Sequence, residues 1–273
     1  FGSKKAALKI LHQMAEGEGF GKIVGQGIKR MKDIFEEKYD ADREIMNDIG
    51  MEAKGLEYSE YITKESLAQQ GGYGLALKGP QHDEAWLIFL DQVENLMPSF
   101  EEKAEALHWF PMWRTWFGLN GLCKLPWNDI QPEDNPETEE PAKVMKHVRW
   151  YSNFFSAVTG RESGPDDLIN HSETVYNFQR IFNYRLGYGT RDYDDIPYRS
   201  AGPVTEKEYK SRQERYDRQL KDLFDIDLEE MSTAGKLEKL RKHREEEYEK
   251  LMDAVYKRRG WTENGIPSNE KIE

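Results

Sequence analysis

Apolar residues recur at helical spacing along almost the whole chain, and no long stretch alternates between apolar and polar residues. Spacings of three and four residues place side chains on one face of an α-helix, whereas a half-buried strand needs strict alternation. The pattern therefore predicts a mainly α fold. The chain has 273 residues, enough for one or two domains with a sizeable core.

Capping residues and glycines set the expected helix ends. Ser3 can cap a first helix that ends at Gly17, and a second amphipathic helix is predicted over 23–35. Gly25 and Gly27 lie inside that second helix, where glycine is costly, so they suggest the close approach of another backbone or a ligand. The other expected helices are 81–93, 100–116 with an interruption at Pro111, 143–158, one that starts at Pro165 and runs through 181, and two long charged helices within 205–259. The expected loops are a glycine-rich segment at 54–82, an exposed acidic loop at 128–141 and a polar loop at 187–203.

Charge and hydropathy exclude two classes of partner. The formal net charge is -12 and no long basic stripe is present, which argues against nucleic-acid binding. No apolar run approaches the roughly 20 residues of a membrane span. We therefore expect a cytoplasmic protein whose acidic surface could dock a basic patch. The start, Phe1-Gly2-Ser3, is neither an initiator nor a signal peptide, so we expect a piece of a longer polypeptide.

Cys123 is the single cysteine, so no disulfide can form within the chain. It follows Gly118 and Gly121 and precedes Lys124, which predicts a position on a loop. Two interpretations stay open: a buried structural thiol, or a metal or cluster ligand. Because an iron–sulfur cluster takes about four thiolates, the second needs further cysteines from outside this chain.

His82 closes the glycine-rich segment and opens the expected helix 81–93. Asp83 and Glu84 after it match the dipole of a helix N-terminus, which is an ordinary structural role. Alternatively, His82 faces a cavity walled by the glycine-rich backbone and transfers a proton. His108 lies among aromatic residues, where a packed, hydrogen-bonded core histidine is expected.

Arginines offer a weaker signal. Most arginines on such helices form surface salt bridges, and phosphate or carboxylate binding is the alternative. The candidates are Arg114, Arg180, Arg185, Arg191 and Arg199. No P-loop, dinucleotide fingerprint, HExxH motif or nucleophile elbow is present.

Short segments along the whole chain change this interpretation when they are taken together. They are Phe1-Gly2, 10–15, Gly19-Phe20-Gly21 through Arg30, Lys54-Gly55-Leu56-Glu57, Gly71-Gly72-Tyr73-Gly74 through His82, Gly121-Leu122-Cys123-Lys124, Thr159-Gly160, Arg180-Ile181-Phe182-Asn183 through Asp194-Asp195-Ile196-Pro197 to Arg199, and Arg259-Gly260-Trp261 with Gly265-Ile266-Pro267. In this order they resemble motif blocks of the aldehyde:ferredoxin oxidoreductase family. Each block alone is unspecific, but the ordered combination is specific.

The resemblance implies the multi-helical C-terminal domains of a tungstopterin oxidoreductase. Residues 1–50 would end a helical second domain, and residues 51–273 would form a helical third domain that contributes cluster and pterin contacts. An N-terminal β-rich domain of the same protein would form the base of the cofactor site. The implied cofactors are a tungsten (or molybdenum) bis-pyranopterin and a 4Fe-4S cluster, with magnesium bridging the pterin phosphates as a further option.

The same resemblance assigns roles to individual residues. Cys123 would be the fourth cluster ligand, with the other three cysteines in a CxxCxxxC motif upstream of this chain. His82 would be catalytic, in proton transfer near the metal. Gly121, Leu122 and Lys124 would bind the cofactor.

Two positions depart from the family pattern. Gly118 stands where the family has Asp, and Lys78 stands where the family has Arg. These departures resemble the branch with the tungsten catalytic subunit of ATP-independent benzoyl-CoA reductase of anaerobic bacteria.

The departures leave three functions to compare. The first is reduction of the benzoyl-CoA ring with an iron–sulfur electron-transfer subunit, which a broad channel with positive residues would favour. The second is aldehyde oxidation to a carboxylate with ferredoxin as acceptor, which a small buried apolar cavity would favour. The third is a non-catalytic helical interaction module, with a buried thiol far from any cavity and His82 hydrogen-bonded in the core. Under all three, the chain alone should be inactive.

Overall fold

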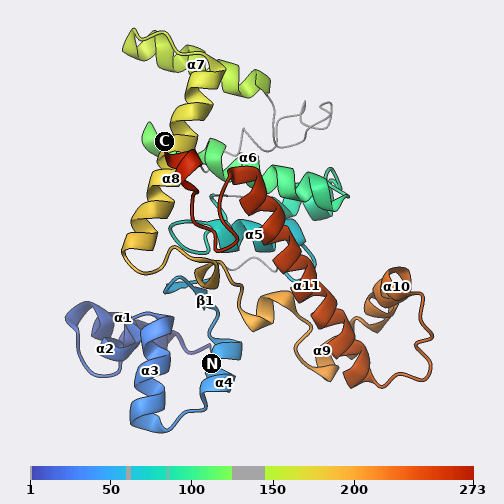
Figure 1. Ribbon diagram of the computed structural model, residues 1–273. Coiled ribbons are helices and arrows are strands. Elements are labelled where there is room, and N and C mark those ends of the chain that lie inside the picture. The colour runs from blue at the N-terminus through green and yellow to red at the C-terminus, as the bar shows by residue number, and fades with distance from the viewer. Residues whose placement is uncertain (1, 60–62, 85, 125–144) are drawn as a thin grey trace.

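A computed structural model describes residues 2–59, 63–84, 86–124 and 145–273 (Figure 1). The prediction of a mainly α fold is confirmed. The helices are α1 (Lys4–Glu16), α2 (Gly21–Val24), α3 (Ile28–Tyr39), α4 (Arg43–Ile49), α5 (Leu67–Leu75), α6 (Phe100–Leu119), α7 (Met145–Thr159), α8 (Pro165–Arg185), α9 (Glu206–Ser211), α10 (Gln213–Phe224), α11 (Thr233–Arg259) and α12 (Asn269–Ile272). A π-helix, η1 (Phe89–Val93), and two 3-10 turns, η3 (Arg191–Tyr193) and η4 (Tyr198–Ala201), join them, and β1 (Glu52–Ala53) pairs antiparallel with β2 (Leu56–Glu57).

The centre of the molecule is a bundle in which α6 packs against α5, α8 and α11. Its core includes the buried side chains of Leu75, Leu107, Phe110 and Leu251. Figure 1 shows α11 as the long red helix that runs from this bundle out to α9 and α10. A second, smaller apolar cluster holds that outer end together; it contains Tyr209, Tyr216, Leu220, Leu228 and Leu240.

Several local predictions hold. The Ser3 hydroxyl accepts a hydrogen bond from the Ala6 amide at 3.3 Å, and Gly17 ends α1 in the left-handed conformation. Pro165 is the first residue of α8. The acidic loop predicted at 128–141 lies outside the described residues, and the domain boundary near residue 50 stays a prediction. None of the helices in the described part of the chain is long and apolar enough to cross a membrane.

The prediction of one helix over 23–35 is wrong. The chain forms α2 and α3 with a break between them, and Gly27 caps α3 at φ 83°, a left-handed conformation that favours glycine. The glycines therefore separate two helices instead of lying inside one.

The prediction of a helix over 81–93 is also wrong, because only η1 is helical among its described residues. The backbone amides of Leu87 and Ile88 donate to the Gln69 side-chain oxygen at 2.8 and 3.0 Å. A buried glutamine on α5 thus satisfies donors that a helix would have satisfied within the segment.

The glycine-rich segment contains a buried helix that the sequence analysis did not predict. Gly71 and Gly74 lie inside α5, where glycine is normally costly. A β-carbon on Gly71 would lie 2.4 Å from Leu107 Cδ1, and one on Gly74 would lie 1.8 Å from Tyr248 Oη. The glycines let α5 approach α6 and α11 closely.

Helix α6 continues through Pro111, against the predicted interruption. A proline has no amide hydrogen, so the carbonyl of Leu107, four residues earlier, loses its helical donor. The buried Arg259 guanidinium on α11 supplies the replacement: Nη2 donates to the carbonyls of Leu107 and His108, both at 2.9 Å.

A buried ionic cluster joins several of the motif blocks. Arg180 donates to both carboxylate oxygens of Asp194 at 2.8 and 2.6 Å, and to the Gly265 carbonyl at 2.7 Å. Lys54 Nζ lies 3.1 Å from Asp194 Oδ1, and the Tyr256 hydroxyl donates to Oδ2 at 2.6 Å. The sequence analysis took Arg180 as a surface salt-bridge partner by default, and that expectation is wrong because both partners are fully buried.

Candidate functional site

His82 lies on a loop that follows α5, not at the start of a helix. Gly79 turns this loop at φ 117°, and a β-carbon there would lie 2.6 Å from Leu56 Cδ1. The ring of His82 is half-buried, and its Nδ1 lies 3.0 Å from the Ser59 hydroxyl. Burial lowers the pKa of His82, helped by the positive charges of Lys78 and Arg114 and opposed by Asp83. His82 is therefore neutral near pH 7.

Cys123 lies on a loop after α6, as predicted. The helix ends at Leu119, and Gly121 takes a left-handed φ of 65° that turns the chain back, so that the Leu122 amide donates to the Phe117 carbonyl at 2.9 Å. The Cys123 thiol is exposed. This contradicts the interpretation as a buried structural cysteine, and with it the buried thiol expected for an interaction module.

The structure brings the His82 loop (76–84) and the Cys123 loop (120–124) together through Arg114. This side chain has 0% exposure on α6. Its Nε donates to the Asp83 carbonyl at 3.0 Å, and its Nη2 donates to the Lys124 carbonyl at 2.9 Å. Sequence reasoning named Arg114 only as one arginine among five, because nothing in the local sequence indicates which carbonyls it reaches.

Ion pairs reinforce this junction. Lys124 Nζ lies 2.9 Å from Glu84 Oε1 and 3.6 Å from Asp83 Oδ2, and Lys78 pairs with both acids. Burial would raise the pKa of Asp83, but Lys78, Lys124 and Arg114 lower it below its ordinary value. The suggested role of Asp83 and Glu84 at a helix N-terminus is therefore wrong; they balance the cations between the two loops.

The other candidate arginines do not indicate a binding site. Arg191 pairs with Glu249 and Asp253, and Arg199 pairs with Asp48. Arg185 is exposed at the end of α8. His108 is half-buried on α6. Within 2–59, 63–84, 86–124 and 145–273, no group of three or more His, Cys, Asp or Glu side chains gathers to hold a metal ion.

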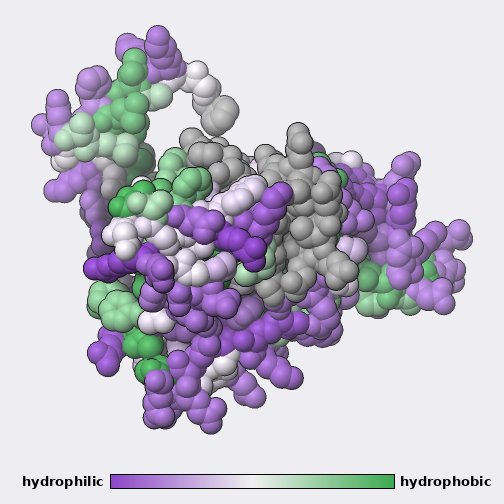
Figure 2. Space-filling model, turned by 90° about the horizontal axis from the view of Figure 1, so that it is seen from above, coloured by the Kyte–Doolittle hydropathy of each residue, from purple (hydrophilic) through white to green (hydrophobic). Residues whose placement is uncertain are grey.

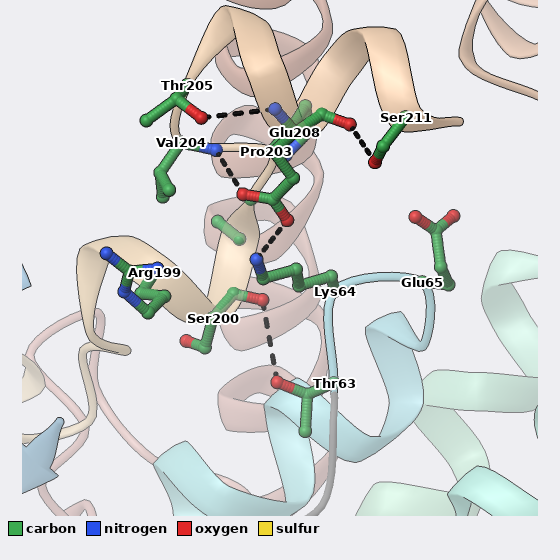
Figure 3. Close-up of polar contacts among 12 residues, drawn as sticks. Thr63, Lys64, Glu65, Arg199, Ser200, Pro203, Val204, Thr205, Glu208 and Ser211 are labelled. Atoms are coloured by element: carbon green, nitrogen blue, oxygen red, sulfur yellow. Dashed lines mark hydrogen bonds and ion pairs between the residues drawn. The ribbon is translucent and has the colours of Figure 1, made fainter. Parts of the chain in front are cut away.

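A pocket of about 410 Å³ is lined in part by Ser59, the residue whose hydroxyl contacts His82. Its lining is Met51, Tyr58, Ser59, Thr63, Lys64, Arg199, Ser200, Glu208, Ser211 and Arg212. Figure 3 shows Lys64 reaching up to Glu208 on α9, with Arg199 to one side. The lining carries three cationic side chains and one acid. Lys64 pairs with Glu208, and Arg199 pairs with Asp48 outside the lining.

Apolar side chains also reach the surface away from these loops. On α7, Trp150, Phe154 and Val158 follow one another at a spacing of four residues and are 48%, 66% and 85% exposed. Figure 2, which views the molecule from the side of α7, shows green apolar patches among the purple ones. This face is separate from the His82 and Cys123 loops in sequence.

Comparison with known proteins gives a consistent match over the whole chain. The family model described as "Aldehyde ferredoxin oxidoreductase, domains 2 & 3" matches residues 1–273. Two curated relatives are similar, the tungsten-containing aldehyde ferredoxin oxidoreductases of Pyrococcus horikoshii and Pyrococcus abyssi. Each is 21% identical, over 100% of this chain and 36% of the relative. The chain thus spans about a third of the length of these relatives.

Proposed function

This chain belongs to the aldehyde ferredoxin oxidoreductase family, and on that premise we propose that it is the helical portion of a tungsten-containing enzyme that oxidises aldehydes to carboxylates. Ferredoxin would accept the electrons, and an N-terminal β-rich domain of the same protein would complete the cofactor site. Both relatives are named for aldehyde oxidation with ferredoxin, which supports this reaction over ring reduction. The observation that carries the proposal is the junction of the His82 and Cys123 loops, which brings two residues with separate expected roles into one region.

Cys123 suits the role of a single cluster ligand. Its thiol is exposed on the turn after α6, where a cluster held by another part of the protein could reach it. Iron is bound by thiolate sulfur, and an iron–sulfur cluster takes about four such ligands. The other ligands of a 4Fe-4S cluster would come from outside this chain.

His82 suits proton transfer. Its lowered pKa keeps the imidazole neutral at pH 7, so it can accept a proton from a substrate or from water. Ser59 holds Nδ1 and thereby fixes the orientation of the ring. A bound tungstopterin would supply the two-electron chemistry.

The proposed pterin contacts differ in how well they fit. Leu122 is 40% exposed and could lie against a pterin. Lys124 is already paired with Glu84, so a contact with the cofactor would compete with that pair. A β-carbon on Gly118 would meet nothing within 4 Å, so the aspartate that the family has there would fit without strain.

Benzoyl-CoA reduction is the second candidate, and one observation favours it. The pocket that Ser59 helps to line also carries Lys64, Arg199 and Arg212, and positive residues suit the phosphates of a CoA ester. An iron–sulfur electron-transfer subunit would then be the partner.

Metal and acid-labile sulfide analysis of the full-length protein tests the cofactor proposal. We expect tungsten (or molybdenum) together with roughly four iron and four sulfide per chain, as one cubane cluster requires. Cys123→Ser should lose most of the iron, whereas His82→Gln should keep the metals and lose turnover. Unchanged iron in Cys123→Ser, or wild-type protein without tungsten or molybdenum, would refute the proposal. Assays of aldehyde oxidation and benzoyl-CoA reduction on the same preparation then separate the two reactions.

A further inference from the structure

Arg114 bridges two loops through Asp83 and Lys124, which are about 40 residues apart in sequence. Nε and Nη2 lie on one edge of the planar guanidinium, and each donates to a different backbone carbonyl. The group also lies over the rings of Phe110 and Phe117, with 5.7 and 5.2 Å between its central carbon and the ring centroids. Stacking and full burial leave the guanidinium little freedom to turn.

We propose that Arg114 is a positioning residue that holds the His82 loop and the Cys123 loop in one fixed arrangement, so that the two loops open and close as a unit. The functional consequence of this inference rests on the proposed function, in which His82 transfers a proton and Cys123 binds the cluster. The joint would then couple the positions of these two groups. The joint itself is a property of the chain and can be tested without the cofactors.

An arginine is required at this position by geometry. Two different nitrogens of Arg114 reach the two carbonyls, whereas lysine has a single nitrogen on a flexible chain, so lysine keeps the positive charge without the rigid two-point contact. Partly buried carbonyls that lose their donors are costly, so both loops would loosen together. The Lys124–Glu84 pair at 2.9 Å forms a second, partly exposed link between the same loops.

The charge of Arg114 has a separate effect from its geometry. It contributes to the lowered pKa of His82, as does Lys78. Arg114→Lys therefore tests the geometry with the charge kept, and Arg114→Gln removes the charge as well.

Hydrogen exchange measured by mass spectrometry on the full-length protein is the test. In Arg114→Lys we expect amides in both 76–84 and 120–124 to exchange about tenfold faster, which corresponds to about 1.4 kcal/mol. Arg259→Lys is the matched control, because Arg259 is also buried and also donates to two carbonyls, but both of these lie within α6. That control should leave both loops at wild-type rates.

Several outcomes would overturn the inference. They are unchanged exchange in both loops of Arg114→Lys, faster exchange in only one loop, or an equal effect from Arg259→Lys. If Arg114→Lys does not fold, the wild-type protein decides the question: the two loops should show the same opening free energy and the same dependence on urea, and different values would refute a joint.

A second measurement concerns catalysis. Arg114→Gln should raise the pKa of His82 and shift the acid limb of the pH–rate profile to higher pH. Arg259→Lys should leave that limb unchanged. Failure of the cluster analysis with Cys123→Ser would remove the proposed function and leave the exchange result standing, so the two failures can be told apart.

Discussion

The Asp194→Asn substitution is the sharpest test of how this chain is held together. The Asp194 carboxylate is fully buried and accepts hydrogen bonds from Arg180 and Tyr256, with Lys54 at 3.1 Å. Asparagine has nearly the same shape but no charge. The substitution would therefore leave two buried cations without their counter-ion.

Breaking a buried ion pair by removing one partner typically costs about 3–5 kcal/mol, because an uncompensated charge stays in the core. We expect a loss of that order in the free energy of unfolding. For a domain of about 200 residues, each kcal/mol lowers Tm by about 2–4 °C, so the midpoint should fall by about 6–20 °C.

Thermal unfolding followed by circular dichroism measures this shift, and Asp195→Asn is the control. Asp195 is the next residue but is exposed, so its substitution should change the free energy by less than about 0.5 kcal/mol. If Asp194→Asn were within 1 kcal/mol of Asp195→Asn, the ionic cluster would not stabilise the fold as argued.

The pH dependence has a definite sign. Burial would raise the pKa of Asp194, but Lys54 and Arg180 lower it overall. The stabilisation is therefore fully present above the unfolded pKa of about 3.9 and is lost as the pH falls through the lower, folded pKa. The gap in stability between wild type and Asp194→Asn should narrow as the pH falls below about 4.

Three further predictions test the packing and the site. Gly74→Ala should destabilise the protein by about 1–3 kcal/mol through overpacking, whereas Gly118→Ala, in open space on α6, should stabilise it by up to about 1 kcal/mol; equal effects in chemical denaturation would contradict the close-packing argument. Arg259→Met should cost about 1–3 kcal/mol, because the Leu107 and His108 carbonyls lose their donor. Combining it with Pro111→Ala should recover about 1 kcal/mol, because the new amide can donate to the Leu107 carbonyl; a double-mutant cycle without coupling would refute this. Turnover in the wild-type enzyme should decrease as the pH drops below about 6.5, because His82 becomes protonated. If His82→Gln protein keeps residual activity with the same acid limb, the limb does not belong to His82.

The sequence determined the type of fold and the position of Cys123 on a loop. Helical spacing predicts α1, α6 and α8, because one apolar face at that spacing is buried in a helical conformation. Ser3 and Pro165 mark helix starts through backbone chemistry that is local to each residue. Gly121 predicts the turn that carries Cys123 for the same reason.

Tertiary structure decided the features that local spacing cannot report. The segment 81–93 is not an α-helix because Gln69, on another helix, takes its amide hydrogens. Helix α6 passes through Pro111, and Arg259, far along the chain, donates a hydrogen bond to the Leu107 carbonyl that the proline leaves without a donor. The His82 and Cys123 loops meet because Arg114 reaches a carbonyl in each. In all three cases a buried backbone group must have a partner, and which side chain provides it depends on how the helices pack and not on the sequence nearby.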